Sequence, residues 1–136
     1  PSFVVRRKEN FARLKEGLLD LQDSFILPEP CENSDPCWFG FLITCKEGCD
    51  RNKVVRYAEE QGVQTRMLFS GNLTKHPCFD QMRREGRGYR IAGDLTVTDR
   101  IMTDTFWIGV YPGMTDEKID YMARVIKEGL SQQKEG

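Results

Sequence analysis

The sequence predicts a small α+β domain, with a sheet of about three strands and helices mainly on one face. Two observations carry this expectation. Apolar residues recur at helical spacing near both ends of the chain, and three short apolar runs typical of strands lie between them. The expected order is helix, strand, helix, strand, short helix, strand, helix. Because 136 residues suit one domain, we expect residues 1–136 to form a single small domain.

Each helix has its own signal. The first is expected over residues 5–22, and Thr115 caps the last one. Asp50 caps a second helix, which Gly62 ends in the left-handed conformation, and Asp94 caps a short third one. The apolar stripes of the two terminal helices are Phe11, Leu14, Leu18 and Leu21, and Ile119, Met122, Ala123, Ile126 and Leu130.

Strands are expected over residues 38–44, 63–68 and 106–111. The first and third of these runs are apolar at nearly every position, although a sheet covered on one side should alternate in polarity. Two explanations stay open. The second face of the sheet packs against a domain or subunit absent from this chain, or long helices cover both faces.

Composition excludes several classes of protein. Twenty basic and 21 acidic residues give a net charge of −1, which argues against nucleic acid or an anionic membrane as the partner. The chain has no apolar run of about 18 residues and no secretory signal, so we expect a soluble cytoplasmic protein. Five cysteines without a disulfide spacing are expected to be reduced thiols, and Cys45 and Cys49 lack the second pair that a metal site needs.

The segment 66–77 is the strongest candidate for a ligand-facing loop, because it follows a predicted strand and carries cationic, amide and hydroxyl groups. Arg66 and Lys75 are suited to phosphate, and Ser70 and Asn72 are suited to a polar ligand such as a sugar. The alternative is a solvated connection, which needs polar residues in any case.

No self-sufficient catalytic constellation is present in the sequence. His76 is the single histidine, and there is no nucleophile elbow, phosphate-cradling loop or dinucleotide fingerprint. The arginine-rich segment 83–93 is expected to be a flexible excursion in which Arg84, Arg87 and Arg90 either attract a diphosphate or are simply solvated. The chain is therefore expected to supply part of a site and no catalytic residue of its own.

Four motifs in order resemble the DegT/DnrJ/StrS sugar aminotransferase-like family of vitamin B6 enzymes. They are NSDPxWFGF at 33–41, TRxLFxGNLT at 65–74, GDLTxTD at 93–99 and TFWIGVYPG at 105–113. The resemblance covers nearly the whole chain. It implies the fold-type I architecture, in which a large domain holds the cofactor and a small carboxy-terminal α+β domain closes over it. This chain is similar to that small domain alone.

Within the family, the resemblance is to the nucleotide-sugar 3-dehydrases. Leu68 and Phe69 stand where aminotransferases of the family usually carry a His-Tyr pair, and residues 72–74 form an extension typical of the dehydrases. The resemblance implies a role in lipopolysaccharide biosynthesis on CDP-4-keto-6-deoxyglucose. It also implies pyridoxamine or pyridoxal 5′-phosphate and an iron–sulfur cluster in the large domain, a partner reductase and a homodimer. Neither cofactor is expected on this chain alone, and His76 is not the family's catalytic histidine.

The resemblance implies a substrate-binding role for the loop that follows the second strand. Arg66 and Lys75 are expected to contact the diphosphate or sugar, and Phe69 is expected to pack beside it. The remaining candidates for substrate contact are Thr65, Ser70, Asn72 and His76.

Three other functions stay open on the sequence alone. They are a stand-alone nucleotide-sugar-binding module, a dimerisation module without catalysis, and a fragment of a sugar aminotransferase. Saturable binding of a CDP-sugar by the chain alone would favour the first of these.

Overall fold

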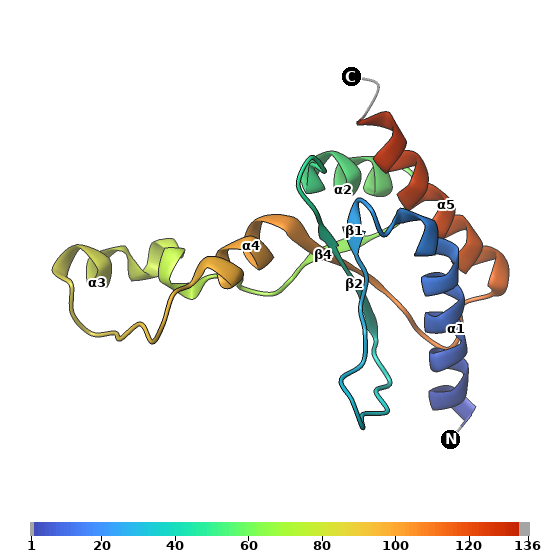
Figure 1. Ribbon diagram of the computed structural model, residues 1–136, viewed down its shortest axis with the longest axis horizontal. Coiled ribbons are helices and arrows are strands. Elements are labelled where there is room, and N and C mark those ends of the chain that lie inside the picture. The colour runs from blue at the N-terminus through green and yellow to red at the C-terminus, as the bar shows by residue number, and fades with distance from the viewer. Residues whose placement is uncertain (1, 134–136) are drawn as a thin grey trace.

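The computed structural model describes residues 2–133 and builds them around one antiparallel sheet. The strands are β1 (Phe25–Ile26), β2 (Gly40–Cys45), β3 (Thr65–Met67) and β4 (Thr105–Gly109). Their order across the sheet is β1-β2-β4-β3, and every pair is antiparallel. The central strands therefore come from the two longest apolar runs of the sequence (Figure 1).

The sheet has four strands where the sequence predicted about three. The additional strand, β1, pairs Phe25 with Cys45 and Ile26 with Thr44. It is two residues long and is followed closely by Pro28 and Pro30, so no alternation of polarity marks it in the sequence.

Three helices cover one face of the sheet, as predicted. They are α1 (Ser2–Leu18), α2 (Arg51–Glu60) and α5 (Asp116–Gln132), and α5 packs against both of the others. The helix expected over residues 5–22 begins earlier, at Ser2, and its last turn is the 3₁₀ helix η1 (Leu19–Leu21). None of the helices in residues 2–133 has the length and apolar character needed to cross a membrane.

The predicted caps of α2 and α5 are confirmed. Asp50 Oδ1 accepts from the backbone N–H of Asn52 at 2.9 Å, and Thr115 Oγ1 accepts from that of Lys118 at 3.4 Å. Gly62 has a φ of +78°, the left-handed conformation expected after α2. Local sequence signals therefore fix the ends of α2 and the start of α5.

The core lies between the sheet and these helices. Phe41 and Ile43 of β2 and Phe106 and Ile108 of β4 are completely buried on the helix-covered face. Leu42 and Trp107 alternate with them and are only partly buried on the other face. In the described chain the helices thus leave one apolar face of the sheet uncovered, which excludes the explanation that long helices cover both faces.

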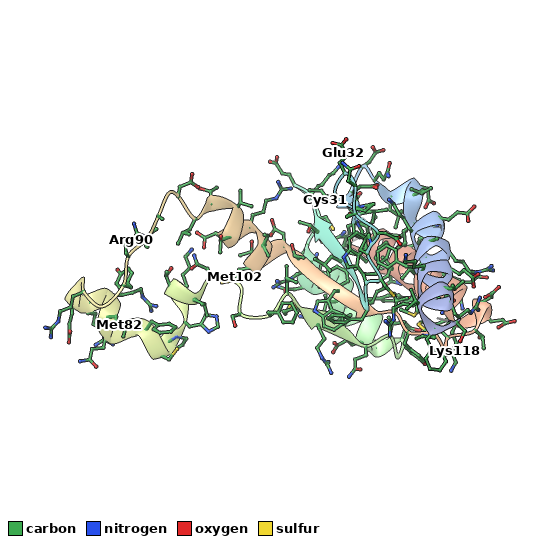
Figure 2. The ribbon with its side chains drawn as sticks, turned by 90° about the horizontal axis from the view of Figure 1, so that it is seen from below. Cys31, Glu32, Met82, Arg90, Met102 and Lys118 are labelled. Atoms are coloured by element: carbon green, nitrogen blue, oxygen red, sulfur yellow. The ribbon has the colours of Figure 1, made fainter. Side chains whose placement is uncertain are left out.

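Residues 69–104, here called the arm, leave the sheet on the side away from α1 and α5 (Figure 1). The arm contains η2 (Leu73–Lys75), η3 (Pro77–Phe79), α3 (Asp80–Glu85) and α4 (Thr96–Asp104). Figure 2 shows Met82 and Arg90 on the arm, at the far end of the molecule from Lys118 of α5.

Helical structure in the arm differs in part from expectation. The segment 83–93 was expected to be a flexible excursion, but its first three residues belong to α3, which ends at Gly86 in the left-handed conformation. The predicted short helix is α4, but its N-cap is Leu95, one residue after the predicted Asp94. Asp94 Oδ1 still accepts from the Thr96 backbone N–H at 2.9 Å.

Candidate functional site

The uncovered face of the sheet presents apolar side chains beside one cation. Leu42 and Arg66 are both register partners of Trp107, so the three side chains project from the same face. Above them is a cavity of about 260 Å³ whose walls are almost entirely apolar. Its lining residues are Trp38, Phe39, Gly40, Leu42, Leu68, Phe69 and Trp107.

Trp107 occupies the middle of this face. Its ring meets Phe39 edge-on at 5.5 Å between centroids, and it lies so close to Gly40 that a Cβ there would come within 2.8 Å of Trp107 Cε3. The indole Nε1–H is buried and has no acceptor within residues 2–133. A buried donor without an acceptor costs free energy, so the Trp107 indole is not satisfied by the described part of the chain.

Arg66 lies at the edge of this surface, on β3. It donates to the carbonyl oxygen of Thr65 at 3.1 Å, and the Gln64 amide oxygen, when turned toward it, accepts at 3.1 and 3.2 Å. Within residues 2–133 no carboxylate forms an ion pair with the guanidinium. The charge therefore remains available for an anion such as phosphate.

Phe69 begins the arm in an unusual conformation. Its φ is +44°, in the left-handed region that bulky residues rarely occupy, and its side chain is 77% exposed. It nevertheless lines the apolar cavity of the sheet face. Strain held in place beside a cavity is typical of a functional position.

Thr65 does not face a ligand, which corrects the contact expected from the sequence. Its side chain is 3% exposed and donates from Oγ1 to Glu59 Oε1 at 2.6 Å. The register pairs it with Ile108 of the core face, opposite to Arg66. Thr65 therefore ties β3 to α2 and positions Arg66 indirectly.

Asn72 also turns inward, where the sequence suggested substrate contact. It is 2% exposed, and its Nδ2 donates to Asp99 Oδ1 at 2.7 Å. Its Oδ1 accepts from the backbone N–H of Thr74 at 3.0 Å and from Thr74 Oγ1 at 2.6 Å. These bonds close the base of the arm, so the amide holds the loop in shape.

Asp99 is the residue of this cluster that sequence reasoning missed. Its second oxygen lies 2.8 Å from Lys75 Nζ. The hydrogen bonds from Lys75 and then Asn72 lower the pKa of the Asp99 carboxyl below its ordinary value. Its position at the end of the motif at 93–99 was the one signal in the sequence that pointed to it.

The two remaining candidates lie at the same base. His76 Nε2 contacts the carbonyl oxygen of Ser70, and Ser70 itself is exposed. The structure thus separates the predicted site into two groups. Arg66 and Phe69 adjoin the uncovered sheet face, whereas Ser70, Asn72, Lys75 and His76 form the base of the arm.

The described residues do not fit a vitamin B6 cofactor. Such a group needs a phosphate cradle, a carboxylate for the ring nitrogen and a lysine or histidine at its reactive carbon. The cavity on the sheet face is lined by apolar side chains and glycine alone, and Arg66, which projects from the same face, does not line it. Within residues 2–133 no three His, Cys, Asp or Glu side chains are grouped to hold a metal ion.

Comparison with known proteins agrees with the expected family and fold. The chain is 48% identical to the lipopolysaccharide biosynthesis protein RfbH of Salmonella typhimurium over 128 residues, which are 93% of this chain and 28% of that protein. It is 45% identical over 129 residues to dTDP-4-dehydro-2,6-dideoxy-D-glucose 3-dehydratase of Saccharopolyspora spinosa, covering 93% of this chain and 27% of that one. The chain therefore spans less than a third of the length of these relatives.

Solved structures and a family model complete the comparison. E. coli GDP-4-keto-6-deoxy-D-mannose-3-dehydratase with bound hydrated PLP superposes with a TM-score of 0.76 at 20% identity, over 93% of this chain and 31% of that one. This likeness confirms that the fold is part of the aminotransferase-like, fold-type I architecture. The model of the DegT/DnrJ/EryC1/StrS aminotransferase family matches residues 1–127. The chain belongs to the DegT/DnrJ/EryC1/StrS aminotransferase family.

Proposed function

We propose that this chain is the carboxy-terminal part of a vitamin B6-dependent nucleotide-sugar 3-dehydrase, acting on CDP-4-keto-6-deoxyglucose in lipopolysaccharide O-antigen biosynthesis. The two relatives at 48% and 45% identity support the dehydrase branch, since one is named for lipopolysaccharide biosynthesis and the other as a sugar 3-dehydratase. Leu68 and Phe69, which replace a His-Tyr pair, support the same branch.

One observation carries the proposal: the uncovered sheet face combines an apolar cavity with the guanidinium of Arg66, which pairs with no carboxylate within residues 2–133. Such a face is suited to closing over a site that another domain holds. The complete protein would supply the pyridoxamine or pyridoxal 5′-phosphate and the iron–sulfur cluster. It would act as a cytoplasmic homodimer that receives electrons from a reductase.

The residues of this chain would then bind and enclose the substrate without taking part in proton transfer. Arg66 makes a charge-assisted hydrogen bond to the diphosphate or sugar, and Phe69 shields it from water. Lys75 is 52% exposed at the base of the arm, where its ion pair with Asp99 offsets its charge, and Ser70 and His76 lie at the same base. Thr65 and Asn72 act by holding β3 and the arm in place.

Arg66→Ala in the complete protein tests this assignment. Loss of a charge-assisted bond should weaken binding of the CDP-sugar by about 1.5–3 kcal/mol, or about 10- to 150-fold in Kd. Arg66→Lys should recover part of the loss, because it keeps the charge without the planar fork. Isothermal titration calorimetry with the cofactor-loaded protein gives the affinity directly.

Arg124→Ala is the matched control. Arg124 is an exposed arginine of α5, on the helix-covered side, where it lies over the Tyr121 ring at 5.0 Å. Its loss should leave the affinity unchanged. Equal affinities for Arg66→Ala and the unsubstituted protein would remove Arg66 from the site. If the complete protein binds the sugar but transfers an amino group to it, the proposed dehydrase activity is wrong and the protein is an aminotransferase.

A further inference from the structure

The arm carries a second surface that the proposed substrate contacts do not use. Asn72 is the one buried residue of the arm, and no apolar side chain of the arm is buried. Five large apolar side chains of residues 70–104 are instead between 40% and 70% exposed. They are Leu73, Met82, Tyr89, Ile91 and Val97.

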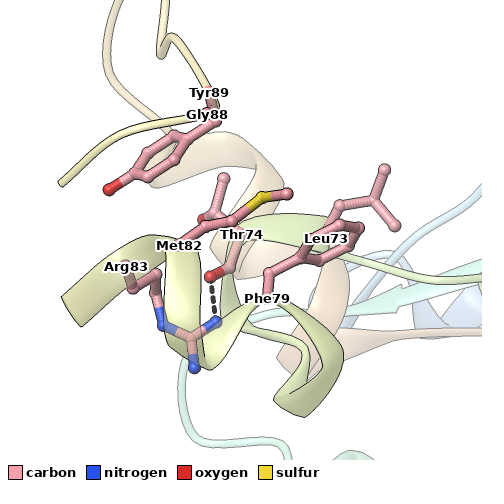
Figure 3. A pocket seen from close by; sticks show the side chains of 7 residues that line it. All are labelled: Leu73, Thr74, Phe79, Met82, Arg83, Gly88 and Tyr89. Carbon is pink, nitrogen blue, oxygen red and sulfur yellow. Dashed lines mark hydrogen bonds between the residues drawn. The ribbon is translucent and has the colours of Figure 1, made fainter. Parts of the chain in front are cut away.

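Several of these side chains surround a cavity of about 210 Å³ within the arm (Figure 3). Its walls are mostly apolar, from Leu73, Phe79, Met82 and Tyr89. Arg83 also lines it, but this guanidinium already donates to the carbonyl oxygens of Thr74 and His76 and pairs with Asp80. The cavity therefore offers few polar groups to a nucleobase or a sugar and suits an apolar side chain instead.

The segment that contributes Met82, Gly88 and Tyr89 to this cavity is rich in arginine. Segment 83–90 holds four arginines and one glutamate. Arg87 pairs with Glu85 at 2.7 Å, whereas Arg84 and Arg90 form no ion pair within residues 2–133. A surface that complements the arm is therefore apolar at its centre and acidic around it.

An arm with so little buried surface of its own needs another surface to pack against. Fixing a backbone residue costs about 1–2 kcal/mol, and the arm recovers little of that cost through burial of its own apolar groups. The hydrogen bond and the ion pair that join its two ends lie at the base, between Asn72, Lys75 and Asp99. Residues beyond that base gain a fixed position by docking against another surface.

The geometry indicates which surface this is. The arm leaves the sheet on the side of the uncovered face, and Leu68 and Phe69 at its start line the cavity of that face. The apolar cavity of the sheet face therefore lies where the arm begins. A domain that covers this face is placed to contact the arm as well. The relatives are more than three times as long as this chain, and a covalently linked domain is present at a high effective concentration.

We propose that the arm is a docking element that grips the large domain of the same polypeptide. An apolar side chain of that domain fills the cavity formed by Leu73, Phe79, Met82 and Tyr89, and acidic groups around it face Arg84 and Arg90. The proposal rests on the proposed function only for the existence of the large domain. It needs none of that domain's chemistry.

Hydrogen exchange in the complete protein tests the docking. Amides of residues 77–98 should be protected, and Met82→Glu should raise their exchange at least tenfold by placing a charge in the cavity. Met82→Ala, a milder change that keeps the protein folded, should raise it by a smaller factor. Leu19→Glu is the matched control, since Leu19 is 45% exposed on η1, outside the arm, and should leave the exchange of the arm unchanged.

A photo-crosslinking amino acid at position 82, in a mixture of isotopically heavy and light protein, identifies the occupant. Crosslinks confined to one isotope, from the arm to the large domain, support the proposal. Crosslinks that join heavy to light chains would assign the cavity to a second copy, and fast exchange of the arm in the folded protein would show that it does not dock. Dehydrase activity is assayed separately, so a protected arm in an inactive protein would overturn the proposed function alone.

Discussion

The side-chain amide of Asn72 donates to Asp99 Oδ1 at 2.7 Å across the base of the arm. The two residues are far apart in the sequence, and Lys75 binds the second carboxylate oxygen at 2.8 Å. This bond joins the segment that enters the arm to the helix α4 that leaves it. We therefore expect the direction of the arm to depend on this bond.

Asn72→Ala should loosen the arm and leave the sheet intact. The change removes a buried amide that makes three hydrogen bonds, and the expected cost is about 1–3 kcal/mol in the free energy of opening the arm. Hydrogen exchange of residues 70–104 measures this cost against that of the core strands. Asn52→Ala is the control, because within residues 2–133 the side-chain oxygen of Asn52 accepts only from the neighbouring Arg51 at the surface. Equal exchange in the two variants would contradict the role given to Asn72.

Acid should open the base of the arm. The pKa of Asp99 is lowered by Lys75 and then by Asn72, so its ionised form stabilises the folded arm above the ordinary carboxyl pKa of about 3.9. This contribution is lost as the pH falls through the lower, folded value. A carboxyl titration by NMR should therefore give a pKa for Asp99 below about 3.9. In Lys75→Met that pKa should rise, and an unchanged value would show that Lys75 does not hold the carboxylate.

Gly40→Ala should destabilise the sheet, because the new Cβ would lie 2.8 Å from Trp107 Cε3 and force the indole to move. We expect a loss of about 1–3 kcal/mol in the free energy of unfolding, measured by urea denaturation. The register partner of Gly40 is Gly109, where an added Cβ meets nothing within 4 Å. Gly109→Ala is therefore the matched control and should be neutral or slightly stabilising. Similar losses in both variants would show that the indole does not restrict this position.

Much of the fold could be predicted because its signals are local. Asp50, Gly62 and Thr115 mark helix ends by their own chemistry, and the apolar runs of β2 and β4 mark the central strands. The strand β1 could not be predicted, because a two-residue strand exists only through its pairing with β2. The apolar outer face of the sheet was predicted from the same runs, which are apolar at nearly every position.

The site was predicted less well, because residue type does not determine which way a side chain points. Thr65 and Arg66 are adjacent, and the alternation of a strand sends one to the core and the other to the open face. Asn72 looked like a ligand group because amides bind sugars, but its partner Asp99 lies on a distant helix. Only the folded arrangement shows that the amide is already engaged.

Thr65→Val should separate the structural role from substrate contact. Valine keeps the shape of the side chain and removes the 2.6 Å hydrogen bond to Glu59, so we expect a loss of about 1–2 kcal/mol in the free energy of unfolding. In the complete protein, the Kd for the CDP-sugar should change less than in Arg66→Ala. A larger effect on binding than on stability would return Thr65 to the substrate contacts.

Gly71→Ala should distort the start of the arm for two separate reasons. Gly71 has a φ of +58°, which costs an alanine about 1 kcal/mol, and a Cβ there would lie 2.5 Å from Met102 Cγ. We therefore expect about 2–3 kcal/mol in the free energy of opening the arm, measured by hydrogen exchange. Gly48→Ala isolates the backbone cost, since Gly48 has a φ of +83° and an open surrounding. Met102→Ala should recover only part of the difference when combined with Gly71→Ala, because it removes Met102 Cγ but keeps the Cβ that would lie 2.8 Å from the new methyl group. A double variant as unstable as the single one would show that the contact with Met102 Cγ contributes nothing to the cost.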